Sequence, residues 1–282
     1  MRITLKQYMH HPNAGDAASA IVVSHITGES LNVVGVERRS GPHLLAIGSI
    51  LEWMDEQSVV WGSGYIRADT PLPAVPKAVL AVRGELTWAK LNSQGVACDP
   101  IFGDPGIFIP EIYPRGQVKW SVGLVPHYVD IDAPFVGRAR AAGLHVINPL
   151  SPFDHYISAL TGCERIISSS LHGLIFAHAY GIPAVWVKLS DHVVGNGFKF
   201  FDYYTSVGVR AHDVPSHSAD DAFPSITESC HLPLGRIDKS ALRDALLGQI
   251  AILRRRAPLR RRLKDVVERN RLKLSRLRSR FL

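Results

Sequence analysis

A histidine follows three consecutive serines in the segment 168–184, where a short β-branched strand is expected to turn into an apolar helix. A Gly-Ile-Pro sequence ends that helix before the next strand. Ser169 or Ser170 can cap the helix and leave its first N–H groups facing an anion. His172 lies in the first turn, beside that anion. The segment therefore predicts a phosphate or carboxylate site with a titratable group next to it.

Proton transfer near neutral pH needs side chains that titrate there, and the ordinary pKa of histidine is about 6.5. His172 and His127 both follow expected strands directly, and ligands sit at the carboxyl ends of strands in open parallel sheets. We predict catalytic roles for these two histidines and for Asp16, which can also cap a helix. Each residue also has an interpretation without catalysis. His172 could start a helix and bond to a carbonyl, His127 could shape the connection between the domains, and Asp16 could only cap its helix.

The same site needs groups that bind an anion. Arg83 directly follows an apolar strand, and we expect it to supply positive charge, although an ordinary surface arginine fits the position too. Lys199 lies in an aromatic cluster that could also fill a core. Turns and helix starts offer further candidate binding residues, namely Ser169, Ser170, Gly173, Asn13, Gly15, Gly62, Ser63 and Gly64. Capping explains Asp104 and Asp130 more simply than a site role, which stays an alternative for both. No His, Cys and carboxylate set has metal-ligand spacing, so no metal is expected.

These side chains need elements that position them, and the sequence alternates strands with helices to about residue 205. Most strand candidates are near-continuous apolar runs, which suit a parallel sheet covered on both faces. They lie at residues 2–5, 31–36, 59–61, 78–82, 120–125, 144–147, 164–168 and 184–187. Helices are expected at residues 17–27, 42–54, 86–94, 133–142, 152–160 and 238–253.

The expected fold is therefore α/β, with two doubly wound Rossmann-like domains that face a cleft. A Pro/Gly-containing stretch near residues 113–117 suggests the boundary, which gives domains at 1–115 and 116–235. Residues 212–235 are predicted to be irregular surface. A packing helix at 236–253 and a tail at 254–282 complete the division.

The net charge of +7 is concentrated in that tail, which holds thirteen Lys and Arg against two acidic residues and leaves −4 for the other 253 residues. A basic body that binds nucleic acid is therefore not expected. Apolar residues recur along the tail among the basic ones, which predicts a basic amphipathic helix on an anionic membrane surface. A coiled-coil dimer or a solvated tail are the alternatives.

The compartment expected from the sequence is the cytoplasm. Cys98, Cys163 and Cys230 are scattered and lack C-x-x-C spacing, which argues against a disulfide framework or a structural zinc site. The first residues contain no signal peptide, and no apolar run reaches the length of a membrane span. We expect a cytoplasmic protein that attaches peripherally to the inner face of the plasma membrane through residues 254–282.

Seven short motifs occur in one order over roughly residues 1–205. They are Asn13-Ala14-Gly15-Asp16, Trp61-Gly62-Ser63-Gly64, Val82-Arg83-Gly84-Glu85-Leu86-Thr87, Gly103-Asp104-Pro105, Gly123-Leu124-Val125-Pro126-His127-Tyr128-Val129-Asp130, Ser169-Ser170-Leu171-His172-Gly173 and Phe200-Phe201-Asp202-Tyr203-Tyr204. In this set the chain resembles the polysaccharide pyruvyl transferase family, close to its ketal-forming exopolysaccharide branch. Many relatives resemble Arg-Leu-His-Gly where this chain has serine at position 170.

The resemblance implies transfer of a pyruvyl group from phosphoenolpyruvate to a sugar of a lipid-linked polysaccharide unit, giving a ketal and phosphate. It also implies a fold that resembles two-domain GT-B glycosyltransferases. Phosphoenolpyruvate would be a donor substrate, and no cofactor is implied. Two other functions stay open: a nucleotide-sugar glycosyltransferase on the same architecture, and a non-catalytic subunit that binds sugars or anions.

Overall fold

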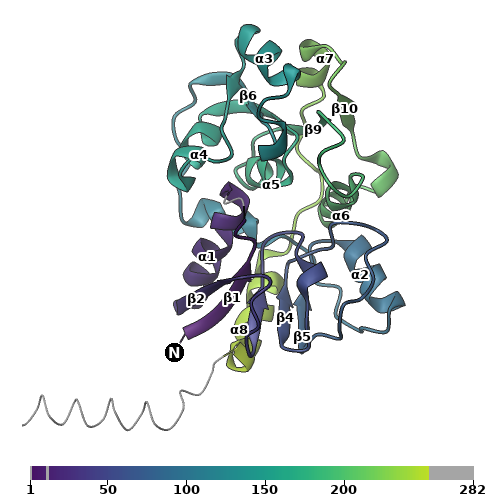
Figure 1. Ribbon diagram of the computed structural model, residues 1–282. Helices are drawn as coiled ribbons and strands as arrows, with labels where there is room; N and C mark the ends of the chain where they lie inside the picture. The colour runs from purple at the N-terminus through teal and green to yellow at the C-terminus, as the bar shows by residue number, and fades with distance from the viewer. Residues whose placement is uncertain (1, 11–12, 254–282) are drawn as a thin grey trace, which may run out of the picture.

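The computed structural model describes residues 2–10 and 13–253 and contains two five-stranded parallel sheets (Figure 1). In the first sheet the strands pair in the order β2-β1-β3-β4-β5, and every pairing is parallel. The strands are β1 (Arg2–Gln7), β2 (Ser30–Gly35), β3 (His43–Leu45), β4 (Ser58–Trp61) and β5 (Ala78–Ala81). Leu5 pairs with Leu44 and Leu44 with Val59, so β3 is a central strand.

The second sheet repeats this arrangement, with the order β10-β9-β8-β6-β7 and parallel pairing throughout. Its strands are β6 (Trp120–Val125), β7 (His145–Val146), β8 (Cys163–Ser168), β9 (Ala184–Lys188) and β10 (Ser216–Ser218). In each sheet the second strand in chain order lies on one side of the first, and the third strand lies on the other side. The chain thus changes direction between β1 and β3 and again between β6 and β8, and ligands of open parallel sheets bind at such points.

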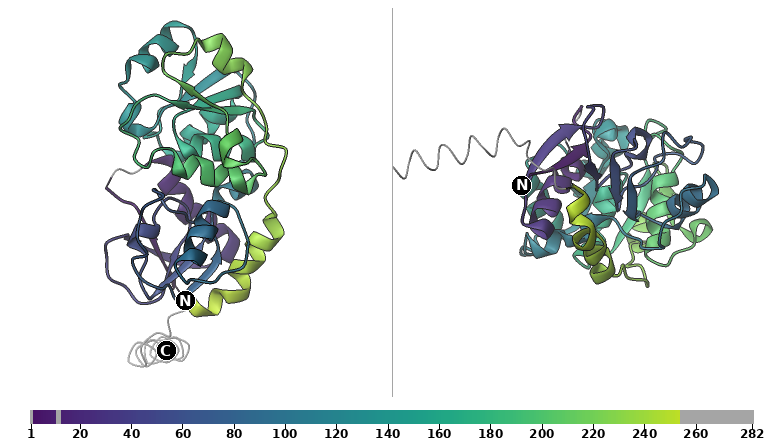
Figure 2. Two further views of the ribbon diagram at one scale, coloured as in Figure 1. Left: turned by 90° about the vertical axis from the view of Figure 1, so that its right-hand side faces the viewer. Right: turned by 90° about the horizontal axis from the view of Figure 1, so that it is seen from below.

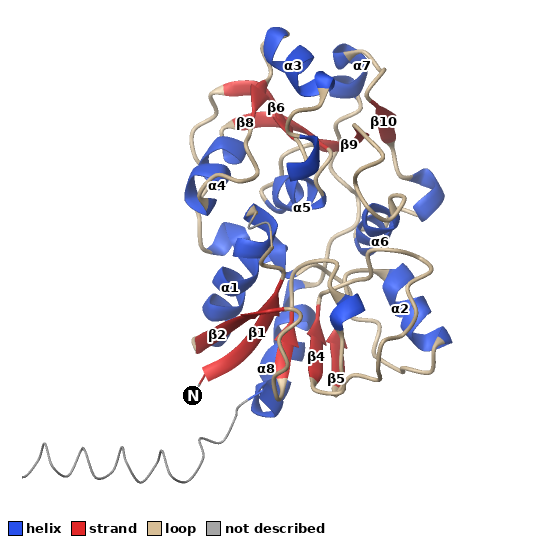
Figure 3. Ribbon diagram, viewed as in Figure 1, coloured by secondary structure: helices blue, strands red, loops and turns tan. Residues whose placement is uncertain are grey.

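Helices connect the strands and cover the sheets (Figure 3). They are α1 (Ala14–Thr27), α2 (Glu85–Ser93), α3 (Pro134–Ala141), α4 (Phe153–Thr161), α5 (Leu171–Ala179), α6 (Phe198–Ser206), α7 (Phe223–Glu228) and α8 (Lys239–Leu253). Short 3₁₀ turns occur at η1 (Leu51–Trp53), η2 (Pro105–Glu111), η3 (Tyr128–Asp130) and η4 (Ala211–Asp213). Gly28, in the left-handed conformation at φ 64°, ends α1 with a bond from its N–H to the Ser24 carbonyl.

The cores follow from the alternation of side chains along each strand. Leu44 belongs to a buried cluster with α1 and α8, whereas Leu45 points to the opposite face, into a cluster that includes Leu91 of α2. The larger cluster continues through η2 and α5 into the second half of the chain. The two sheets therefore share one apolar core.

The chain returns to the first sheet at its described end. The segment before α8 runs down the length of the molecule from the second sheet to the first (Figure 2). There α8 packs against β4 and β5, and the indole N–H of Trp61 donates to the carbonyl of Leu242 at 2.7 Å. Leu242, Leu246 and Leu253 are the buried residues of α8.

Two parallel-sheet α/β units are confirmed, and residues 120–125 form β6 as predicted. The helix expected at 42–54 is wrong: the Leu44-Leu45 pair forms the buried strand β3, and only one 3₁₀ turn follows. The segment 212–235 is less irregular than expected, because it contains β10 and α7. The predicted basic helix at 254–282 lies outside the described residues, and the division into domains stays a prediction.

The two halves also meet where the start of α2 lies against α6. The backbone N–H of Thr87 donates to the Asp202 carboxylate at 2.8 Å, and that of Glu85 donates to the Thr205 hydroxyl at 3.0 Å. Gly84 precedes α2, and a Cβ atom there would overlap the carbonyl oxygen of Asp202. Glycine is required at this position by the close approach, since its φ of −161° suits any residue.

We expect Gly84→Ala to destabilise the protein by about 1–3 kcal/mol, the usual cost of overpacking. The measurement is the urea midpoint of unfolding. Gly137→Ala is the matched control, because a Cβ on Gly137 in α3 meets no atom within 4 Å. The control should raise stability by up to about 1 kcal/mol, as alanine does in helices. An unchanged midpoint for Gly84→Ala would contradict the close packing of α2 on α6.

Candidate active site

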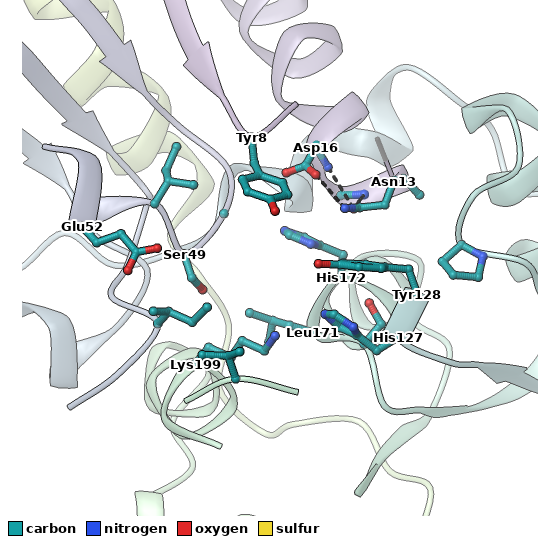
Figure 4. A pocket seen from close by; sticks show the side chains of 18 of the residues that line it. Tyr8, Asn13, Asp16, Ser49, Glu52, His127, Tyr128, Leu171, His172 and Lys199 are labelled. Atoms are coloured by element: carbon teal, nitrogen blue, oxygen red, sulfur yellow. Dashed lines mark hydrogen bonds between the residues drawn. The ribbon is translucent and has the colours of Figure 1, made fainter. Parts of the chain in front are cut away.

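A pocket of about 400 Å³ opens where the carboxyl ends of the two sheets face one another (Figure 4). Its lining comes from the segments after β1, β3 and β4 of the first sheet and after β6, β8 and β9 of the second. Seven of the predicted site residues line it: Asn13, Gly15, Asp16, His127, Ser170, His172 and Lys199. The structure thus brings together residues up to 186 positions apart in the chain.

His172 stands beside the buried carboxylate of Asp104, for which the sequence favoured capping over a site role. Its Nε2 lies 3.7 Å from Oδ2 of Asp104, whose side chain is fully buried. Both atoms are buried and lack a hydrogen-bond partner among the described residues. The other carboxylate oxygen of Asp104 accepts from the N–H of Gly106 at 2.8 Å and so caps η2. Asp104 therefore presents a buried carboxylate oxygen to Nε2 of His172.

The start of α1 packs against the other nitrogen of the imidazole. A Cβ atom on Gly15 would overlap Nδ1 of His172, so glycine permits this contact. Asn13 caps α1 by accepting from the N–H groups of Gly15 and Asp16, and its amide donates to the Asp16 carboxylate at 2.6 Å. Burial raises the pKa of Asp16 to about 6, although the charge of His172 opposes the rise. Asp16 can therefore exchange a proton near neutral pH.

His127 is held through its backbone and stays uncharged. Its N–H donates to the Ser169 hydroxyl at 2.8 Å, and that hydroxyl donates to the buried Asp130 carboxylate at 2.9 Å. Burial and the nearby charges of Lys199 and His172 lower the pKa of His127 to about 3. Because Nδ1 accepts from the N–H of Val129, the proton of the neutral ring is assigned to Nε2. His127 is thus suited to donate a hydrogen bond rather than to carry charge.

Lys199 is the buried cation of the pocket. Its side chain enters from the first turn of α6, and the residue is 8% exposed. Burial and the neighbouring charge of Arg83 lower its pKa to about 8, while Asp130 acts in the opposite direction. Lys199 is therefore positively charged at neutral pH and faces the pocket beside His127 and His172 (Figure 4).

We predicted that Arg83 binds an anion, but its side chain does not line the pocket. Its side chain is fully buried, and its Nε donates to Asp202 at 2.8 Å. The two terminal nitrogens donate to the Ser49 hydroxyl and the Tyr65 carbonyl, each at 2.6 Å. All three nitrogens are thus occupied by the protein itself. Arg83 instead anchors α6, the helix that carries Lys199.

The remaining predicted residues do not line the pocket and instead pack around it. Ser63 is buried and its hydroxyl donates to the Ala46 carbonyl at 2.7 Å. A Cβ on Gly62, Gly64 or Gly173 would overlap Pro105, Arg83 or Ser168 respectively, so these glycines allow close packing. Ser169 lines a neighbouring cavity of about 210 Å³ with Trp186, and in addition it fixes His127.

Among residues 2–10 and 13–253, no group of three or more His, Cys, Asp or Glu side chains could hold a metal ion. Within that part, none of the helices combines the length and the apolar character that crossing a membrane requires.

The charge of Lys199 gives a pH dependence that can be measured. A lysine with a pKa of about 8 is charged below that pH and neutral above it. We expect the affinity for sulfate, a dianion over this whole range, to fall about tenfold or more as the pH rises through about 8, because a charge-assisted hydrogen bond is lost. Isothermal titration calorimetry measures this affinity.

Lys199→Met should bind sulfate weakly at every pH and lose the transition. Lys119→Met is the control, because Lys119 is exposed and lies outside the pocket. A transition near pH 8 that persists in Lys199→Met would assign the charge to another group.

Part of this site lies in a segment that is similar to known proteins. Residues 76–191 match the model of the family described as polysaccharide pyruvyl transferase, and this segment contains Asp104, His127 and His172. The chain is 27% identical over 224 residues to uncharacterized protein L143 of Acanthamoeba polyphaga mimivirus, which covers 74% of this chain and 75% of that protein. It is 30% identical over 172 residues to succinoglycan biosynthesis protein ExoV of Rhizobium meliloti strain 1021, which covers 58% of this chain and 52% of ExoV.

The aligned region with ExoV thus spans about half of that protein. A solved structure of a functionally uncharacterized protein from Klebsiella pneumoniae matches with a TM-score of 0.43 and 12% identity, over 76% of this chain and 92% of that one. The family model and the similarity to ExoV support the same assignment. Within residues 76–191 the chain matches the polysaccharide pyruvyl transferase family.

Proposed function

We propose that this protein transfers a pyruvyl group from phosphoenolpyruvate to two hydroxyls of a sugar in a polysaccharide unit, forming a cyclic ketal and releasing phosphate. The observation that carries the proposal is the buried Asp104–His172 pair, which lies beside the cationic Lys199 in one pocket. Two of these residues lie in the segment that matches the family model.

The donor needs a strongly cationic end of the pocket. Phosphoenolpyruvate carries a carboxylate and a phosphate of about −1.5 to −2 charge near pH 7. Lys199 supplies a full positive charge, and the N-terminus of α5 supplies free N–H groups, since Ser170 makes no side-chain capping bond there. Lys199 thus takes the role expected for Arg83 and compensates for the arginine that many relatives have in place of Ser170. The Nε2–H of neutral His127 adds a further donor to the phosphate.

Two titratable groups, His172 and Asp16, carry the protons of the reaction. Protonated His172 gives its proton to the methylene carbon of the donor, and Asp104 stabilises the imidazolium before that transfer. The adjacent carbon, now electron-deficient, is attacked by a sugar hydroxyl, whose proton passes to the Asp16 carboxylate. A second hydroxyl of the same sugar then displaces phosphate, and its proton leaves with the phosphate. Transfer of the proton from Asp16 to His172 restores the starting state.

The setting of the reaction is part of the same proposal. The two facing parallel sheets suit a fold related to GT-B glycosyltransferases. A lipid-linked acceptor on the cytoplasmic face of the membrane fits the concentration of Lys and Arg in residues 254–282. The similarity to ExoV, a succinoglycan biosynthesis protein, supports a surface polysaccharide as the product.

The direct test incubates the full chain with phosphoenolpyruvate and a pool of lipid-linked oligosaccharides. We expect phosphate release and an equal amount of acceptor that has gained one pyruvyl ketal, without any nucleotide. His172→Ala and Asp104→Asn should each lower kcat by about 100-fold or more, as loss of general acid–base catalysis does. Mass spectrometry and a phosphate assay measure the two products.

His155→Ala is the control for this experiment. His155 is exposed, pairs with Asp154 and lies outside the pocket, so its loss should not change kcat. A requirement for a nucleotide sugar would instead favour the glycosyltransferase. Absence of any turnover, with phosphoenolpyruvate still bound, would favour the non-catalytic subunit.

A further inference from the structure

The first sheet supplies a part of the pocket with different chemistry from the cationic end. Tyr8 follows β1, Glu52 and Trp53 follow β3, and Arg67 follows β4. None of these four residues takes part in the proton transfers or in donor binding as proposed above. They face the pocket opposite the second sheet, and Figure 4 shows Glu52 and Tyr8 on the side away from His127.

The two aromatic rings of this part serve both the core and the pocket. Tyr8 and Trp53 have ring centroids 6.0 Å apart at an interplanar angle of 45°. Each packs on the buried cluster that contains Leu45 and Met54, yet each is only partly buried and lines the pocket. A ring with a supported back and an accessible front offers a flat apolar surface to a ligand.

The polar groups of this part suit hydroxyls, and the charge of Arg67 faces the opposite charge of Glu52. Burial raises the pKa of Glu52, although the charge of Arg67 opposes this rise. A carboxylate accepts hydrogen bonds from hydroxyls, whereas a guanidinium donates to them. The negative charge of Glu52 repels a phosphate, so a dianionic donor is directed to the Lys199 end of the pocket.

We infer that Tyr8, Glu52, Trp53 and Arg67 form a pyranose subsite. The apolar face of the sugar ring lies on Trp53, and Glu52 and Arg67 bind its hydroxyls. This inference rests on the proposed function, in which a sugar is the acceptor. It assigns the two substrates to different sheets: the second sheet holds the donor, and the first holds the acceptor.

Tyr128 contacts residues at both ends of the pocket, and it bounds the pyranose subsite on the side of His127. Its side chain hydrogen-bonds with Tyr8, and its ring lies 4.5 Å from the ring of His127. A sugar on Trp53 thus lies beside Tyr8, which Tyr128 links to the His127 end of the pocket. The hydroxyl pair that becomes pyruvylated is the pair that this orientation turns toward His172 and Asp16.

The test measures sugar binding without any donor. Saturation-transfer NMR with a panel of methyl pyranosides of gluco, galacto and manno configuration gives a dissociation constant for each variant. We expect Trp53→Ala to weaken binding about tenfold, as the loss of an aromatic surface does, and Trp53→Phe to retain most of the affinity. Glu52→Gln should weaken binding severalfold, because an uncharged amide is a weaker acceptor. Sulfate affinity should not fall in any of these variants.

Trp88→Phe and Glu56→Gln are the matched controls, since both residues belong to the first half of the chain and lie outside the pocket. Pyranoside binding that is unchanged in Trp53→Ala and Glu52→Gln would overturn the subsite. So would a parallel loss of sulfate binding in the correctly folded Trp53→Phe variant, or failure of the wild type to bind any glycoside of the panel. Pyranoside binding through Trp53 without ketal formation would contradict the proposed function and leave the subsite intact.

Discussion

All strands of a parallel sheet end at the same edge, so the segments that follow them gather there. This constraint determines where every group of the candidate site lies. Both sheets have the same strand order and change direction after the first strand. At these two points the connections from neighbouring strands lead to opposite faces of the sheet, and they leave a crevice between them. Because the two edges face one another, the two crevices form one pocket. His127 and His172 enter it from one sheet, and Asp16 and Glu52 enter it from the other.

The pocket depends on how the two halves are held together. The buried Arg83–Asp202 pair crosses the junction at 2.8 Å, and both side chains are fully buried. A buried ion pair adds little net stability, yet loss of one partner costs about 3–5 kcal/mol because the other charge stays buried. Asp202 also accepts from the N–H and the hydroxyl of Thr87. The pair thus fixes α6 on α2, and with it the position of Lys199.

Local sequence patterns predict elements well and long-range partners poorly. The apolar run at 120–125 was predicted as a strand, and it forms β6. The run at 43–47 has the composition of a helix or of a buried strand, and pairing with β1 and β4 decides for the strand. Arg83 was expected to bind an anion because it follows a strand. Its partner Asp202 is 119 residues away, so no local pattern reveals that the charge is used internally.

Asp104 is a second residue whose long-range partner no local pattern reveals. One of its carboxylate oxygens does cap a turn, as a local pattern indicates, but the other faces a histidine 68 residues further along the chain. The burial of Lys199 also appears only in three dimensions, since its neighbours in the sequence are aromatic and suggest a core. The histidine in the first turn of α5 was identifiable, because a strand, a polar turn and an apolar helix surround it locally.

The central claim is that His172 delivers a solvent-derived proton to the methylene carbon of phosphoenolpyruvate in this pocket. Turnover in heavy water, followed by mass spectrometry of the ketal, tests it most directly. We expect one deuterium in the ketal methyl group for the wild type, and a rate lowered by about 100-fold or more in His172→Ala. A ketal methyl group without deuterium, or labelled ketal formed by His172→Ala at the wild-type rate, would contradict it.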